Sequence, residues 1–299
     1  MNAGLRIGLL GYGEVGQIFG ADLAIVARQL STYDVAFSDR SSPQYIKVLA
    51  QPNITRCVSA AELASQSDLI FSAVTAEQAN AAAHSVCKHL LRDAWFVDLN
   101  SASPATKRQA AQQINKTGGR YVEASVMSPV PPTRLATPIL IGGLHASGFL
   151  KLKNSIGLTD VSVFSDQYGP TSAAKMCRSI MVKGIEALLV ESLVTARGYG
   201  VEKTVLNSLD DLLPGPDWPR LAKYMIGRTL EHGGRRAEEM REVAKTVNDA
   251  SLPANMSLAT VAVQDWAKTY PEFQNLEALD AILDALGAAA LQSTKGNAA

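Results

Sequence analysis

Cysteine, an excess of charge of either sign, and long apolar runs are all scarce in this 299-residue sequence. The three cysteines form no CxxC pair, so we expect neither a disulfide framework nor a structural zinc site. The 28 basic and 28 acidic side chains balance, which argues against a nucleic-acid-binding protein. No apolar run reaches the roughly 18 residues that a membrane span needs, and no signal peptide is recognisable. We therefore expect a cytoplasmic enzyme or binding protein without a membrane segment.

A metal site is not expected either. The four histidines are scattered along the chain, and His84 and His89 stand five residues apart. Two helical metal ligands would be four residues apart and would have a carboxylate partner. The chain does have ample apolar residues, at 47 % of the sequence, and therefore enough for a sizeable core.

The first half of the sequence alternates short apolar runs with helical patterns. Predicted strands cover residues 5–10, 34–39, 55–60, 69–74, 94–100, 120–127, 137–143 and 160–166. Predicted helices between them cover residues 15–30, 60–67, 76–91 and 103–118. Strands that alternate with helices imply crossover connections, and hence an α/β fold with a parallel sheet covered on both faces.

The pattern changes near residue 168. A single long helix is predicted over residues 170–199, and no strand signal follows it. The later helical patterns cover residues 201–213, 217–231, 234–250, 254–268 and 275–292, with "HGG" as one of the breaks. We therefore predict two domains, an α/β domain at residues 1–167 and an all-α domain at residues 168–299.

The stretch "RIGLLGYGEVGQIFG" at residues 6–20 contains a GxGxxG motif between a predicted strand and a predicted helix. Gly11 permits the tight turn, Gly13 lets a pyrophosphate approach the backbone, and Gly16 lets the helix pack closely on the strand. The helix N-terminus adds N–H groups and a positive dipole. We predict a doubly wound Rossmann-type domain that binds NAD or NADP, although a packing turn without a ligand would have the same glycines. The other cofactor-binding candidates near these strand ends are Glu14, Val15 and Val74.

The residues after the second predicted strand bear on the choice of cofactor. Asp39 is placed to hydrogen-bond the adenosine ribose and to repel a 2′-phosphate, which favours NAD. Arg40 follows directly and can instead bind that phosphate. We favour NAD because a carboxylate facing a phosphate is costly. Asp39 could also be only a turn residue at the strand end.

Three further stretches, together with the glycine loop, resemble the β-hydroxyacid dehydrogenase superfamily, which includes 3-hydroxyisobutyrate and 6-phosphogluconate dehydrogenases. "VDLNSASP" at residues 97–104 is similar to the family's D-x-S-T-x-x-P segment. The resemblance implies that Asn100 binds the cofactor and that Ser101 binds the substrate, while capping of the next helix is the alternative role. The resemblance covers about the first 200 residues, and the remainder is similar to a less characterised, phosphogluconate-dehydrogenase-like branch.

"YVEASVMSPVPP" at residues 121–132 is similar to the stretch that holds the substrate carboxylate in better-known branches, F-x-D-A-P-V-S-G-G. The S-G-G positions are occupied here by Met127, Ser128 and Pro129. Two backbone-exposing glycines are lost, and proline has no N–H. Met127 and Ser128 remain substrate-binding candidates, for a larger or less polar substrate, although Met127 can equally be a core residue.

"GPTSAAKMCRSIMVKGIEALLVE" at residues 169–191 is similar to the family's G-x-x-x-x-x-K helix, and Lys175 stands at the catalytic lysine position. Ser179 replaces the usual asparagine four residues later and is a substrate-binding candidate. At 3.6 residues per turn, Lys175, Ser179 and Glu186 share one face, whereas we expect Lys183 to lie off that face in a supporting role. Lys175 can act as a general base only when neutral, so burial or a nearby positive charge must lower its pKa.

The segment "EHGGRRAEEM" at residues 231–240 supplies two further substrate-binding candidates, His232 and Arg235, because arginine binds carboxylates bidentately. The alternative is a capped helix start with surface charges. Taken together, the sequence predicts an NAD(P)-dependent dehydrogenase of β-hydroxy acids that acts through Lys175 and forms a homodimer through the long helix. The alternatives are an imine-reductase-like enzyme and a non-catalytic dinucleotide-binding regulatory protein.

Overall fold

The computed structural model describes residues 4–212 and 214–296 of the chain. It divides into two compact units, Met1–Met176 and Cys177–Ala299. This division lies C-terminal to the boundary expected after residue 167, because the first turns of the long helix belong with the sheet.

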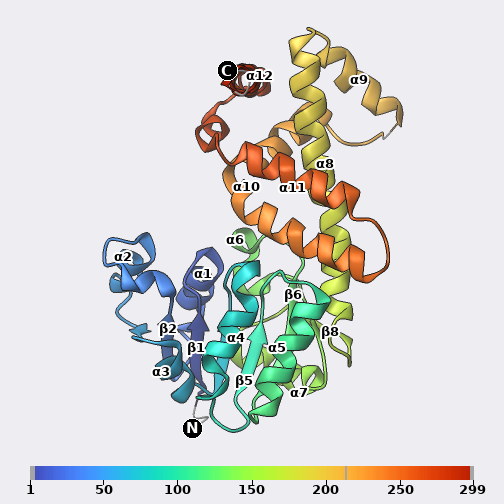
Figure 1. The fold of residues 1–299 in the computed structure, drawn as a ribbon. Coiled ribbons are helices and arrows are strands. Elements are labelled where there is room, and N and C mark those ends of the chain that lie inside the picture. The colour runs from blue at the N-terminus through green and yellow to red at the C-terminus, as the bar shows by residue number, and fades with distance from the viewer. Residues whose placement is uncertain (1–3, 213, 297–299) are drawn as a thin grey trace. The chain divides into compact units, whose positions relative to one another are not determined.

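The first unit is built on one eight-stranded sheet with the order β3-β2-β1-β4-β5-β6-β7-β8 (Figure 1). The strands are β1 (Arg6–Leu10), β2 (Gln29–Tyr33), β3 (Thr55–Arg56), β4 (Leu69–Ser72), β5 (Trp95–Asp98), β6 (Arg120–Val126), β7 (Ile139–Gly142) and β8 (Val161–Ser165). All neighbours are parallel except β6 and β7. The chain leaves β1 toward β2 and returns to pair β4 with β1, so the strand order reverses there. This is the predicted doubly wound Rossmann-type sheet, in which ligands bind beyond the carboxyl ends of the strands at such a reversal.

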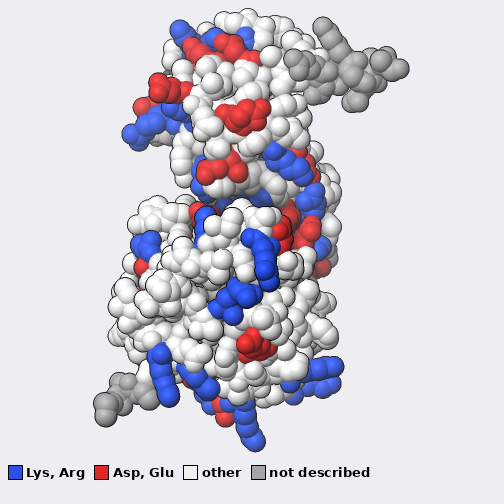
Figure 2. Space-filling model, turned by 90° about the vertical axis from the view of Figure 1, so that its left-hand side faces the viewer, with Lys and Arg blue, Asp and Glu red and all other residues white. Residues whose placement is uncertain are grey.

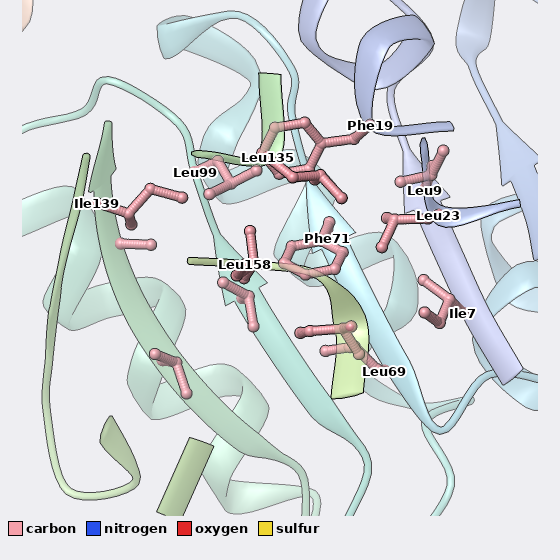
Figure 3. Close-up of a cluster of buried hydrophobic side chains, with 14 of the residues drawn as sticks. Ile7, Leu9, Phe19, Leu23, Leu69, Phe71, Leu99, Leu135, Ile139 and Leu158 are labelled. Atoms are coloured by element: carbon pink, nitrogen blue, oxygen red, sulfur yellow. The ribbon is translucent and has the colours of Figure 1, made fainter. Parts of the chain in front are cut away.

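Helices cover both faces of this sheet. They are α1 (Glu14–Leu23), α2 (Pro43–Leu49), α3 (Ala60–Ser65), α4 (Ala79–Cys87), α5 (Pro104–Lys116), α6 (Val130–Thr133) and α7 (Ala146–Leu150). Short 3₁₀ turns are η1 (Val35–Ser38), η2 (Ala76–Gln78), η3 (Arg134–Ala136) and η4 (Lys153–Ile156). One core packs α1 against β1 and β4 through Phe19, Leu23 and Phe71, as Figure 3 shows. The other packs α3, α4 and α5 on the opposite face. Because both faces are covered, the strands have apolar side chains on both sides.

The second predicted strand is wrong in position. The strand is Gln29–Tyr33, and residues 35–38 form the 3₁₀ turn η1. The predicted helix 15–30 accordingly ends at Leu23. The physical reason lies at Asp34, whose carboxylate accepts hydrogen bonds from the backbone N–H of Tyr12 and of Ala36, at 2.6 and 2.8 Å. These bonds end the strand and turn the chain, and the apolar alternation of "VAFS" belongs to that turn.

The second unit is helical. It contains most of α8 (Pro170–Gly198), followed by α9 (Glu202–Leu212), α10 (Trp218–Asp249), α11 (Asn255–Ala267), the turn η5 (Pro271–Asn275) and α12 (Leu279–Gly296). Residue 213, the last of the predicted helix 201–213, lies outside the described residues. A core of leucine, isoleucine and alanine side chains joins α8, α10, α11 and α12, and the indole of Trp218 packs into it.

The "HGG" stretch does not break the helix, because α10 continues through it as one helix of 32 residues. A Cβ on Gly233 would lie 2.6 Å from the carbonyl oxygen of Gln264 and 3.0 Å from Lys268. The glycine therefore permits close packing of α10 on α11, which outweighs the roughly 1 kcal/mol that a helical glycine costs. The prediction of two helices, and of a helix start at this point, is wrong.

Acidic and basic side chains are interspersed on the surface. Figure 2 shows both signs spread over the visible face, without a continuous patch of one sign among the residues described there. Within residues 4–212 and 214–296, none of the helices has the length and apolar character needed to cross a bilayer.

Candidate functional site

The glycine loop joins β1 to α1 at the point where the strand order reverses. Gly11 has φ +98°, and a Cβ there would lie 2.4 Å from the carbonyl oxygen of Ala73, so both the turn and the close approach require glycine. A Cβ on Gly16 would lie 2.2 Å from the carbonyl oxygen of Gly11. Gly13 differs, because nothing lies within 4 Å of its Cβ position. Gly11 and Gly16 therefore serve the fold, whereas the absence of a side chain at Gly13 leaves space for a ligand at the start of α1.

Asp34, which the sequence analysis missed, stands directly after β2. Its hydrogen bond with Tyr12 N ties the end of β2 to the glycine loop. An acidic residue at the end of the second strand is the usual ribose-binding group of this type of sheet. The sequence offered only a weak signal, since Asp34 follows the short segment "QLSTY", and the misplaced strand concealed it.

Asp39 and Arg40 do not stand at a strand end. Asp39 follows η1 and is exposed, and its carboxylate accepts hydrogen bonds from Ser41 N and Ser41 Oγ at 2.8 and 2.7 Å. These hydrogen bonds hold the pKa of Asp39 below its usual value. Arg40 is exposed as well. The placement of Asp39 at the end of the second strand is therefore corrected, and Asp34 takes that position.

Asn100 lies between the ends of β4 and β5. Its side-chain oxygen accepts a hydrogen bond from Val74 N at 2.7 Å, and its amide nitrogen donates to Ser72 Oγ at 3.0 Å. It is buried, so these bonds fix the loop that carries Val74 beside Gly11. The alternative capping role falls instead to Ser103, the N-cap of α5. Ser101 is half-buried.

A buried ion pair holds the loop that contains Asn100. Lys107 Nζ lies 2.9 Å from Asp98 Oδ1, and both side chains are 1 % exposed. The same ammonium donates to the Asp98 carbonyl, and Asp98 Oδ1 accepts from Asn100 N. Tyr121 donates its hydroxyl to Asp98 Oδ2 at 2.7 Å, and burial followed by the charge of Asp98 raises the pKa of that phenol well above its usual value. The pair therefore holds the backbone at the carboxyl end of β5.

Met127 and Ser128 follow β6. Met127 N donates to the Pro138 carbonyl at 2.9 Å, and Ser128 Oγ lies 3.0 Å from Thr137 Oγ1. Both side chains are half-buried. Neither residue belongs to the fully buried core, so both stay candidates for contact with a substrate.

Lys175 lies in the second turn of α8 and is half-buried. The first turn of this helix is attached to β6 through Glu123, whose two carboxylate oxygens accept from Gly169 N and Ser172 N, each at 2.6 Å. The first unit therefore contains the glycine loop, Asp34, Asn100, Met127, Ser128 and Lys175.

The remaining candidates belong to the second unit, and Lys183 among them is corrected. It is buried and not off the face of Ser179: its Nζ donates to Ser179 Oγ at 3.2 Å and pairs with Glu239 at 2.7 Å. Helical spacing alone placed Lys183 off that face, whereas Glu239 of α10 supplies a buried partner for it. Arg235 is exposed and lies 3.6 Å from Glu239.

His232 contacts Arg228, whose Nη1 lies 2.8 Å from His232 Nε2. Because a guanidinium can only donate, Nε2 accepts in this contact. Burial, followed by the nearby positive charges of Arg228, Arg235 and Arg236, lowers the pKa of His232 to about 4. The imidazole is therefore neutral at neutral pH.

Two family descriptions match this chain. Residues 6–154 match the NAD binding domain of 6-phosphogluconate dehydrogenase, and residues 196–267 match a domain of unknown function. Together with the strand order and the glycine loop, the first match defines an NAD(P)-binding protein of the Rossmann type.

Relatives cover nearly the whole chain. A conserved hypothetical protein from Sinorhizobium meliloti is 34 % identical over 95 % of this chain and 96 % of its own, with a TM-score of 0.71. A conserved protein of unknown function, described as similar in structure to 3-hydroxyacid dehydrogenases, is 31 % identical over 91 % of this chain and all of its own, with a TM-score of 0.67. The mitochondrial 3-hydroxyisobutyrate dehydrogenase of Drosophila melanogaster is 23 % identical over 71 % of this chain and 65 % of its own length. The chain belongs to the β-hydroxyacid dehydrogenase superfamily, in a branch with the uncharacterised helical domain.

One neighbour bears on the alternatives. An imine reductase from Myxococcus stipitatus in complex with NADP⁺ has a TM-score of 0.55 at 14 % identity, over 94 % of this chain and 99 % of its own. At that identity the likeness shows the fold alone.

Proposed function

We propose that this protein is an NAD-dependent dehydrogenase that interconverts a β-hydroxy acid, or a related polyol acid, and its carbonyl form, with Lys175 as general acid and base. One observation carries the proposal. The open Cβ position of Gly13, the carboxylate of Asp34 and the lysine of α8 all belong to one unit with the doubly wound sheet.

The residues present fit a dinucleotide. A helix start at a glycine with open space accommodates a pyrophosphate, and α1 offers its positive dipole end there. Glu14 and Val15 belong to the same turn, and Asn100 holds Val74 beside it. Asp34 accepts ribose hydroxyls and repels a 2′-phosphate, which favours NAD over NADP. Arg40 is the residue that would favour NADP.

The chemistry then divides between cofactor and protein. A bound nicotinamide takes up or supplies the hydride. Lys175 takes the hydroxyl proton from the alcohol when its amine is neutral, and returns it to the carbonyl oxygen as an ammonium in the reverse direction. General acid–base help of this kind contributes about 10² to 10⁴ in rate.

In the sheet unit, the proposed substrate-binding residues are Ser101, Met127 and Ser128. In the helical unit, the proposed substrate-binding residues are Ser179, His232 and Arg235. Arg235 is suited to a carboxylate because its guanidinium is exposed. The neutral imidazole of His232 suits a hydroxyl or a carbonyl. The loss of the two glycines at residues 128–129 favours a substrate with more apolar surface than those of the better-known branches.

A homodimer is part of this proposal. An apolar groove of about 340 Å³ runs along α8 and α11 and is lined by Val190, Val194, Val263 and Trp266 among others. Leu188 on α8 and Tyr199, directly after its end, are exposed. A second copy would cover this surface. Light scattering that gives the mass of a single chain at micromolar concentration would contradict the dimer.

The main test is turnover. NADH formation is measured over a panel of β-hydroxy acids, with Lys175→Ala and, as the matched control, Lys88→Ala on the exposed end of α4. We expect Lys175→Ala to lower kcat about 10² to 10⁴-fold without changing the dissociation constant of NAD. Near-normal kcat in Lys175→Ala would refute the catalytic role, and a protein that ignores both dinucleotides would refute the proposal.

The cofactor preference has its own test. Asp34→Asn should weaken NAD binding roughly 10-fold or more, because hydrogen bonds to a charged group contribute about 1.5–3 kcal/mol. Asp39→Asn is the control and should change the affinity little. The affinities are measured by titration with the reduced cofactor, whose nicotinamide is fluorescent. Equal effects of the two variants would contradict the assignment of Asp34.

The imine reductase is the second candidate, favoured by the shared fold of the Myxococcus stipitatus enzyme. Turnover of cyclic imines, measured beside that of the hydroxy acids, decides between them. A preference for the imines that persists in Lys175→Ala would favour this second candidate.

A further inference from the structure

We propose that Glu123 is the positioning residue for Lys175: it replaces the N-cap that α8 lacks and thereby fixes the catalytic helix to β6. The inference rests on the proposed function, in which Lys175 moves the proton. It assigns a role to a buried carboxylate that has no part in the proton transfer itself.

The start of α8 cannot cap itself. Gly169 precedes Pro170 and has φ +118°, in the region that side chains rarely adopt. A Cβ at Gly169 would also lie 2.7 Å from Arg108 Nη1. Gly169 therefore has no side chain that could accept the N–H groups of the first turn, although a serine or aspartate usually does so at this position. The N–H groups of Gly169 and Ser172 need an acceptor from elsewhere.

Glu123 supplies that acceptor from the sheet. Its side chain is completely buried on β6, 46 and 49 residues before the two groups that it binds. Oε2 accepts from Gly169 N and Oε1 from Ser172 N, each at 2.6 Å. A carboxylate with both oxygens occupied suits a helix N-terminus, because the positive end of the helix dipole favours negative charge. The arrangement is a capping box whose acid comes from another element.

A second contact from the same strand holds the same turn. Ser125 Oγ donates to the Thr171 carbonyl at 3.2 Å. Glu123 and Ser125 are two residues apart on β6 and therefore share one face. Met127, one residue after the end of β6, is the next position in this alternation and is a proposed substrate contact. Lys175 follows Thr171 by four residues and Ser172 by three, so it lies one turn along the helix from these contacts. β6 therefore sets the position of Lys175, the general base, relative to the proposed substrate-binding residues Met127 and Ser128.

The test replaces the acid and keeps its size. In Glu123→Gln the amide nitrogen faces one of the two N–H groups and cannot accept from it. The matched control is Glu62→Gln, because Glu62 also accepts a backbone N–H, from Val58 at 2.6 Å, but does so on α3 beside β1 and β2. Glu123→Asp keeps the charge with one methylene fewer and is the conservative variant.

We expect Glu123→Gln to lower kcat about 10- to 100-fold, since a displacement of about 1 Å can have that effect. The dissociation constant of NAD should stay within about twofold of wild type, because the glycine loop joins β1 to α1 and includes neither β6 nor α8. Glu123→Asp should recover part of the loss in kcat. Glu62→Gln should leave kcat unchanged. A kcat of Glu123→Gln equal to that of wild type, or a fall matched by the loss of folded protein in a melting curve, would overturn the inference.

Two readouts do not need turnover. Amide exchange at residues 169–176 should accelerate in Glu123→Gln while the rest of the sheet unit keeps its protection. Acylation of the Lys175 amine should reach its midpoint at a lower pH, because the substitution removes a negative charge that is bound to the first turn of the same helix. An unchanged midpoint and unchanged exchange would contradict the role of Glu123. If wild type oxidises no hydroxy acid, the proposed function fails, and these two measurements still decide the role of Glu123.

Discussion

The sheet unit and the helical unit bury charge in different ways. In the sheet unit, Glu123 binds two backbone N–H groups, and the ion pair of Asp98 with Lys107 also binds the backbone at the end of β5. In the helical unit, Lys183 pairs with Glu239 and also contacts Ser179. In a second pair there, Glu186 binds Arg236 and also accepts a hydrogen bond from the side-chain amide of Gln264 at 3.3 Å. These buried charges of the sheet unit thus bind backbone groups, in addition to side-chain partners at Asp98, whereas those of the helical unit bind other side chains.

The difference follows from the secondary structure. Strand ends, tight loops and helix starts leave backbone groups without partners, and buried charges can satisfy them. The interior of a helix satisfies its own backbone, so a charged side chain on its buried face needs a partner on another helix. In the sheet unit the buried charges therefore hold the loops of the proposed site. In the helical unit they specify which helix faces pack together.

The largest expected effect contrasts the two ion pairs. Lys107→Met should reduce the free energy of unfolding by about 3–5 kcal/mol, because it leaves Asp98 buried without its counter-ion. Lys183→Met should cost less, because Glu239 keeps Arg235 at 3.6 Å and is itself 12 % exposed on its side chain. Urea unfolding of both variants measures this. Equal losses of unfolding free energy would show that the two units tolerate an unpaired carboxylate equally, which would contradict the proposed difference between them.

A second contrast concerns glycine. Gly16→Ala should destabilise the sheet unit by about 1–3 kcal/mol, because its Cβ would overlap the Gly11 carbonyl at 2.2 Å. Gly227→Ala in α10 should stabilise the helical unit by about 0.5–1 kcal/mol, since nothing lies within 4 Å of its Cβ position. Thermal unfolding of the two variants gives the signs. A stable Gly16→Ala protein would mean that the loop can shift, and a destabilised Gly227→Ala protein would mean that this part of α10 is closely packed.

Whether a feature depends on local contacts or on contacts between distant elements decides whether the sequence could predict it. The GxGxxG motif gave the correct location of the loop, because Gly16 is required by its contact with Gly11, five residues earlier, and Gly11 by its positive φ. Seven of the eight strands were also predicted at positions that overlap the observed ones. Only the second strand was misplaced, because the apolar alternation of η1 imitates a strand, and the error moved the ribose-binding acid from Asp34 to Asp39.

The helical unit was harder to predict for a physical reason. The burial of Lys183 depends on Glu239, 56 positions further along the chain, and no local pattern in α8 indicates that partner. Gly233 looked like a helix break because its reason is the approach of α11, which is a tertiary contact. The cap of α8 was missed similarly, since Glu123 precedes the helix by more than 40 residues. Contacts that link distant elements leave no local signal in a single sequence.

The smallest expected effect is the pH dependence of the helical unit at His232. Its pKa is about 4 in the folded protein, against about 6.5 in the unfolded chain. Above pH 6.5 both states are neutral and the full stability is present. As the pH falls from 6.5 toward 4, His232 takes up a proton in the unfolded chain but stays neutral in the folded state, so the free energy of unfolding decreases. The imidazole is partly exposed, so we expect a loss of less than about 1 kcal/mol after screening by solvent.

His232→Gln isolates this contribution from the other groups that face it. Arg228, Arg235 and Arg236 oppose protonation of the imidazole, whereas Glu239 favours it. Glu186 works in the opposite direction, because burial raises its pKa and the folded state therefore gains stability as it takes up a proton. The urea midpoint of wild type should fall more between pH 7.5 and 5 than that of His232→Gln, while the control His84→Gln, at an exposed position of α4, should follow wild type. Identical slopes in wild type and His232→Gln would show that burial and the three arginines do not keep this imidazole neutral.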